Sequence, residues 1–108
     1  MLQEIQAACG LPGVATVGTT LRQLYALCEA ASSMVSVDSG PGHAAAALSV
    51  PLAVLYGAES PRYWLPRSPS GSPVVGVGGP PASRRADQVS VEALFGAWCS
   101  VARQPLAT

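Results

Sequence analysis

The sequence predicts an α/β domain built on a partial, doubly wound parallel sheet. Segments of strand length alternate with segments of helical periodicity along most of the 108 residues, which is typical of βαβ units. The strand-like segments are apolar at most positions, and this favours burial by helices on both faces. The first predicted element is a helix with no strand before it. We therefore expect residues 1–108 to be a single partial domain, the later part of a larger one.

The first three elements are two helices with a short strand between them. Residues 2–9 carry apolar side chains at helical spacing, and a glycine and a proline end this helix. Residues 13–18 (GVATVG) are rich in strand-forming residues and predict a strand. Residues 19–32 have an apolar stripe of helical period, and Thr19 or Thr20 supplies the N-cap.

The next three elements form a strand–helix–strand unit. Residues 34–37 (MVSV) predict a strand. Residues 40–50 predict a helix of small residues that opens at Pro41, because the N–H that proline lacks has no partner in the first turn anyway. Residues 51–57 (PLAVLYG) predict a second strand, which is mostly apolar.

The last part of the chain contains two loops, a strand and a helix. Residues 58–73 include four prolines and predict a long loop. Residues 74–78 (VVGVG) predict a strand, and residues 79–88 predict a second loop. Residues 90–103 predict a closing helix that Ser90 caps.

The composition excludes several classes of function. Six basic residues balance six acidic ones, so no net field attracts nucleic acid or anionic lipid. Three widely spaced cysteines lack metal-ligand spacing, so we expect reduced thiols, no structural metal and a cytoplasmic protein. The first residues lack the pattern of a signal peptide, and the longest apolar run is too short to span a membrane.

The segment DSGPGH, residues 38–43, joins a predicted strand to the helix after it. In an open parallel sheet, ligands bind where strands end and helices begin, and the unpaired N–H groups of a helix start attract anions. Gly40 would let a phosphate approach the backbone, and Ser39 would add a donor. Asp38 would accept from sugar hydroxyls, and a neutral His43 would donate to a phosphate or sugar oxygen. These residues predict a site for a sugar joined to a phosphate.

The same residues also have a plainer interpretation. Asp38 or Ser39 could only cap the helix, and the glycines could only turn the chain. Spacing alone does not separate the two interpretations. The segment after the next strand, which includes Tyr63 and Trp64, is interpreted as a polar loop with its aromatic residues packed on the sheet.

The stretch MVSVDSGPGHAAAALSVPLAVLYGAESPRYWLP resembles the signature of the heptosyltransferases, glycosyltransferase family 9. The shared pattern is a strand, Asp-Ser-Gly-x-x-His, a small-residue helix, a proline, and a second strand that ends in glycine. Helices on either side are also similar, so that the resemblance covers residues 10–103. It implies the C-terminal, nucleotide-sugar-binding domain of an enzyme with two Rossmann-like domains facing across a cleft, the GT-B fold.

The resemblance also implies a role for each matching residue. The donor-binding residues would be Thr19 at the nucleotide base, Asp38 at the sugar, Ser39 and Gly40 at the pyrophosphate, and His43 at phosphate or sugar. The donor would be a nucleoside-diphosphate sugar, usually ADP-heptose, and the acceptor a lipopolysaccharide core or similar glycan or lipid-linked acceptor. No cofactor or metal is implied. The enzyme would work in the cytoplasm, with peripheral association at the inner face of the inner membrane.

No catalytic residue is expected in this chain, because the family's acidic base lies in the N-terminal domain. The isolated chain is therefore expected to be inactive. The segment GAESP, residues 57–61, replaces the family's Gly-Pro-Thr-Asp-Pro, which leaves the role of Glu59 open. One alternative is another sugar-nucleotide enzyme of GT-B architecture, either an epimerase or a different glycosyltransferase. The alternative from another class is a non-catalytic remnant that binds a nucleotide or phosphate.

Overall fold

The structure is a computed structural model that describes residues 2–12, 15, 17–58, 65–80 and 85–102. Its elements follow one another as α1 (Leu2–Cys9), α2 (Leu21–Ala30), β1 (Met34–Val37), α3 (Gly40–Ala47), β2 (Leu52–Tyr56), β3 (Val74–Gly78), a 3₁₀ turn (Ala86–Gln88) and α5 (Val91–Ala102).

The three described strands form one parallel sheet in the order β1-β2-β3. Val37 at the end of β1 lies beside Leu55 of β2, and Tyr56 at the end of β2 lies beside Gly78 of β3. The carboxyl ends of all three strands therefore meet at one edge of the sheet. This edge is where a parallel sheet binds its ligands.

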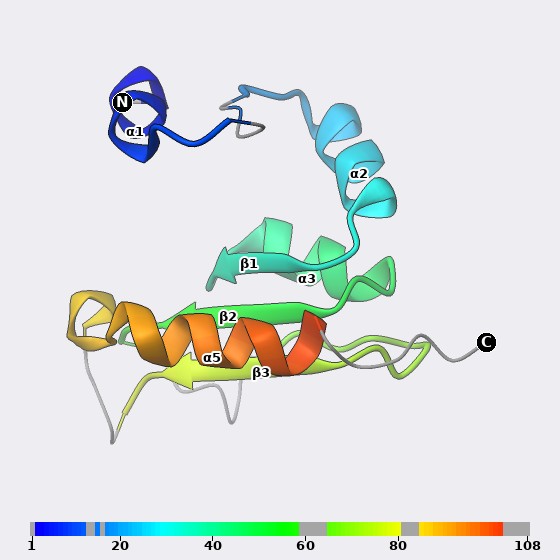
Figure 1. The fold of residues 1–108 in the computed structure, drawn as a ribbon. Helices are drawn as coiled ribbons and strands as arrows, with labels where there is room; N and C mark the ends of the chain where they lie inside the picture. The colour runs from blue at the N-terminus through cyan, green and yellow to red at the C-terminus, as the bar shows by residue number, and fades with distance from the viewer. Residues whose placement is uncertain (1, 13–14, 16, 59–64, 81–84, 103–108) are drawn as a thin grey trace.

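Helices cover both faces of the sheet, as the predicted fold class requires. Helix α3 packs on β1 and β2, and α5 packs on β2 and β3 from the other face, while α2 lies against α3 (Figure 1). The main core lies on the α3 side, where alternate side chains of β2 meet small side chains of α3 and Cys28 of α2. Its fully buried β2 members are Leu52, Val54 and Tyr56. The α/β architecture is thus confirmed.

The helix caps agree with the sequence pattern. Thr20, rather than Thr19, is the N-cap of α2, and it forms a reciprocal capping box with Gln23 at 3.2 and 3.0 Å. Ser90 accepts a hydrogen bond from the N–H of Ala93 at 3.0 Å, so the predicted cap of α5 is confirmed.

One predicted strand is not found among the described residues. The described residues of the segment 13–18, which are residues 15, 17 and 18, lie outside the sheet, and residues 13, 14 and 16 lie outside the described residues. The physical reason is that a strand needs a hydrogen-bonded neighbour, and this segment has none in the described sheet.

All three cysteines are free thiols, with Cys28 buried in the core and Cys9 exposed. In the part of the chain that the structure describes, no helix is long and apolar enough to cross a membrane.

Candidate functional site

The segment that joins β1 to α3 lies at the carboxyl edge of the sheet. Asp38 directly follows β1, Ser39 is the N-cap residue of α3, and Gly40 is the first residue of the helix. Asp38, Gly40 and His43 are exposed, and Ser39 is half-buried. The structure therefore brings four of the five predicted donor-binding residues together in one turn. We call residues 38–43 the α3 turn.

The α3 turn lacks a side-chain cap. The hydroxyl of Ser39 makes no hydrogen bond to the helix and instead donates to the carbonyl oxygen of Val37 at 3.3 Å. Within the described residues, the carboxylate of Asp38 does not cap the helix either. A helix start leaves its first N–H groups without intrahelical partners, and among the described residues no side chain caps them here. The plainer interpretation, in which the Ser39 side chain caps the helix, is therefore not what the structure shows.

The two glycines of the α3 turn have different surroundings. A Cβ atom added at Gly40 would meet nothing within 4 Å, so the backbone there is open to a ligand. A Cβ atom at Gly42 would come within 2.9 Å of the Ser36 hydroxyl oxygen, so Gly42 allows α3 to pack closely on β1. The N–H of Gly42 donates to the carbonyl oxygen of Ser39 at 3.2 Å, and Pro41 has no N–H. Gly40 is thus the glycine that faces outward.

A buried phenol lies next to the acidic residue of the turn. Tyr56 is fully buried at the carboxyl end of β2, one register position beyond the Val37–Leu55 pair and so beside Asp38. Burial, and secondarily the Asp38 carboxylate, raise the pKa of the Tyr56 phenol above its ordinary value. The phenol therefore stays neutral at physiological pH, and Asp38 remains exposed as a hydrogen-bond acceptor.

The fifth predicted residue, Thr19, lies in another place. It is exposed just before the N-cap of α2, and it lines a hollow of about 460 Å³ together with Val17, Gly18, Gln23, Ala26 and Leu27. No residue of the α3 turn lines this hollow. The described residues therefore do not join Thr19 and the α3 turn in one cavity.

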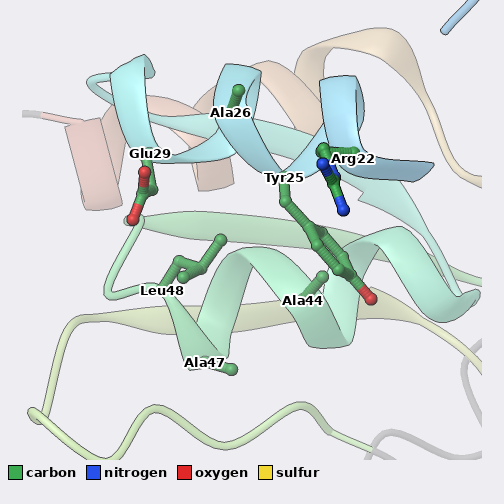
Figure 2. A pocket seen from close by; sticks show the side chains of 7 residues that line it. All are labelled: Arg22, Tyr25, Ala26, Glu29, Ala44, Ala47 and Leu48. Atoms are coloured by element: carbon green, nitrogen blue, oxygen red, sulfur yellow. The ribbon is translucent and has the colours of Figure 1, made fainter. Parts of the chain in front are cut away.

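Sequence reasoning missed a second hollow, which lies between α2 and α3 and has a volume of about 530 Å³ (Figure 2). Its lining residues are Arg22, Tyr25, Ala26, Glu29, Ala44, Ala47 and Leu48. The ring of Tyr25 reaches across toward Ala44, the residue after His43 (Figure 2). The signal in the sequence was the helical spacing of Arg22, Tyr25 and Glu29 on one face of α2, beside a helix of alanines.

The chain at the 3₁₀ turn passes close to the end of β2, which the sequence did not indicate. A Cβ atom at Gly57 would come within 3.0 Å of the backbone nitrogen of Ala86, so glycine allows the chain around the 3₁₀ turn to pass close to this strand end. Three residues considered in the sequence lie outside the described residues: Glu59, Tyr63 and Trp64.

Comparison with known proteins adds an independent line of evidence. The sequence profile of glycosyltransferase family 9 (heptosyltransferase) matches residues 1–92. The chain is also similar to lipopolysaccharide heptosyltransferase 3 of Escherichia coli, with 38% identity over 69 residues. The matched stretch is 62% of this chain and only 20% of that relative. No solved structure matches the chain.

Proposed function

Because the chain belongs to glycosyltransferase family 9, the heptosyltransferases, we propose that it is the donor-binding part of such an enzyme, in which the α3 turn binds the diphosphate of a nucleoside-diphosphate sugar. The observation that carries this proposal is the uncapped start of α3 beside an open Gly40. An oxyanion can approach the backbone there and meet the N–H of Gly40, which no side chain of the described residues caps.

The other residues of the α3 turn suit the sugar and the second phosphate. Asp38 is exposed and accepts hydrogen bonds, which suits sugar hydroxyls and disfavours contact with phosphate. His43 is exposed in the same turn, and an imidazole N–H there donates to a phosphate or sugar oxygen. We place the nucleotide base near Thr19, at the hollow in front of α2.

The proposed reaction is transfer of the donor sugar. An acceptor hydroxyl attacks C1 of the sugar, the bond from C1 to the diphosphate oxygen breaks, and the nucleoside diphosphate leaves with the developing negative charge. N–H groups and a hydrogen-bond donor that already point at this charge lower the barrier, because they need no reorganisation. We place the base that deprotonates the acceptor outside residues 1–108, so that the chain by itself transfers no sugar.

We further propose ADP-heptose as the donor and a lipopolysaccharide core as the acceptor, because the similar protein from Escherichia coli is named a lipopolysaccharide heptosyltransferase. In this proposal the enzyme works in the cytoplasm, peripherally at the inner face of the inner membrane.

The test is a titration of the chain with ADP, monitored by two-dimensional NMR of the backbone amides. We expect ADP to shift the amide signals of residues 38–43, and Gly40→Val to weaken binding about tenfold or more, since hydrogen bonds to a charged oxygen are lost. Gly96→Val is the matched control, because a Cβ atom at Gly96 in α5 also meets nothing within 4 Å. Unchanged ADP binding by the Gly40 variant would refute the proposal and favour the simple turn.

A further inference from the structure

One end of the hollow between α2 and α3 lies next to the α3 turn. Arg22 and Tyr25 of α2 lie at this end, beside Ala44 of α3 (Figure 2). Ala44 directly follows His43, the last residue of the α3 turn, and lies about one helical turn, roughly 6 Å along the axis, beyond Gly40. The first turns of α2 and α3 therefore meet at the same end of the hollow, and this end adjoins the proposed diphosphate site.

Arg22 is a cation without a charged partner. It is exposed and forms no ion pair among the described residues. Glu29, the acidic residue of the same hollow, lies at the opposite end (Figure 2). Arg22 also lies in the first turn of α2, where the partial positive charge of a helix start disfavours a cation, and that turn contains no acidic side chain. A cation kept at an unfavourable position indicates a role other than stability.

The α3 turn lacks the charge that a diphosphate requires. Each phosphate of the donor is negative, whereas the start of a helix offers only about half of an elementary positive charge. Asp38 adds a negative side chain to the same turn. An arginine guanidinium carries a full positive charge, and its paired N–H donors match two oxygens of one phosphate. Arg22 is therefore the kind of residue that the α3 turn does not itself contain.

The position of Arg22 also fits the path of the donor. The hollow at Thr19 and the hollow between α2 and α3 lie along neighbouring faces of α2, since Ala26 lines both. Arg22 follows Thr19 by three residues, at the start of α2. A donor with its base near Thr19 and its diphosphate at the α3 turn passes this start of α2. Arg22 thus lies between the two parts of the proposed site.

We propose that Arg22 is a further donor-binding residue, whose guanidinium pairs with the diphosphate from the α2 side of the α3 turn. This inference rests on the proposed function and extends it to a residue of another helix. The diphosphate is then held from two sides, by the N–H of Gly40 and by Arg22. Tyr25, whose hydroxyl lies at the same end of the hollow (Figure 2), supplies a second donor.

The experiment measures ADP binding to the 108-residue chain by calorimetry. Arg22→Gln should weaken binding about tenfold or more, since a hydrogen bond to a charged oxygen is lost. Arg22→Lys should fall between that variant and the parent, because lysine keeps the charge but not the paired donors. Arg67→Gln is the matched control, since Arg67 is exposed and lines neither hollow, and it should bind ADP as the parent does.

Two further measurements separate ligand binding from a structural role. The NMR signal of the Arg22 Nε–H group should shift when ADP is added and should stay in place with adenosine, which has no phosphate. Arg22→Gln should leave the free energy of unfolding in urea unchanged or slightly raised, because it removes a cation from a helix start. A loss of stability that matches the loss of ADP binding would overturn the inference in favour of a structural role.

The outcome for Arg22 is distinguishable from the outcome for the donor site as a whole. If Gly40→Val weakens ADP binding and Arg22→Gln does not, the inference is wrong and the proposed function stands. An equal loss in Arg22→Gln and Arg67→Gln would also overturn it, because the effect would then be one of net charge. If neither Gly40→Val nor Arg22→Gln changes ADP binding, the proposed function fails together with the inference.

Discussion

Gly42 is the residue on which the position of the α3 turn depends, and Gly42→Ala tests that dependence. The added Cβ would lie 2.9 Å from the hydroxyl oxygen of Ser36, 3.4 Å from its Cβ and 3.5 Å from the carbonyl oxygen of Val37. Ser36 is 8% exposed, and its hydroxyl donates to that same carbonyl at 2.7 Å. The contact therefore cannot be relieved by swinging a long side chain into solvent, and α3 must move away from β1.

Two opposing effects set the expected size of the change. Overpacking of a closely packed contact costs about 1–3 kcal/mol. Replacing glycine by alanine inside a helix gains roughly 0.5–1 kcal/mol, since the unfolded chain loses less freedom on folding. We therefore expect Gly42→Ala to lower the free energy of unfolding by about 1 kcal/mol, within a net range of about 0–2.5 kcal/mol. Because α3 shifts with the new side chain, ADP binding should weaken as well.

The assay is urea denaturation of four variants. Gly96→Ala is the control, because its Cβ meets nothing within 4 Å and it should gain roughly 0.5–1 kcal/mol. Ser36→Ala removes the clashing oxygen, so that Gly42→Ala made in that background should be neutral or stabilising. If Gly42→Ala in the otherwise unchanged chain stabilises the protein as much as Gly96→Ala does, the close approach of α3 to β1 is not a constraint and the reasoning is wrong.

The remaining predictions concern the turn and the buried phenol. His43→Ala should weaken ADP binding by roughly 1.5–3 kcal/mol in calorimetry, the value of one hydrogen bond to a charged group; an unchanged affinity would remove His43 from the site. Asp38→Asn should leave ADP affinity nearly unchanged and should lower turnover in an enzyme that contains this domain, since Asp38 is assigned to the sugar. A loss of ADP affinity with unchanged turnover would instead assign Asp38 to the phosphates. The raised pKa of Tyr56 stabilises the fold below the ordinary tyrosine pKa of about 10, and this contribution is lost as the pH rises through the higher folded value. Tyr56→Phe should therefore reduce the alkaline loss of stability in urea titrations, and an unchanged alkaline loss in this variant would contradict the prediction.

The sequence indicated most of the elements around the site for local reasons. MVSV and PLAVLY are uninterrupted strand-forming runs, and the helix between them begins at a proline and consists of small residues, so that each local preference agreed with the fold. The sequence also predicted the α3 turn, with Asp38, Ser39, Gly40 and His43, from the position of this segment between a predicted strand and a predicted helix. The segment 13–18 has the same local character as a strand, but strand formation depends on a neighbour, and local sequence carries no information about whether one is present.

The sequence by itself determined the alternation of strands and helices, the family, and the residues of the α3 turn, because each of these depends on residue types at short spacing. Only the tertiary structure decided which glycine faces open space and which faces the sheet, that Ser39 makes no side-chain cap, that Tyr56 lies beside Asp38, and that β1 is an edge strand of the described sheet. Those facts depend on distances between residues from different elements. Such distances are set by how closely α3 and the strands pack, and packing follows from the combined shapes of many side chains rather than from any short stretch of the chain.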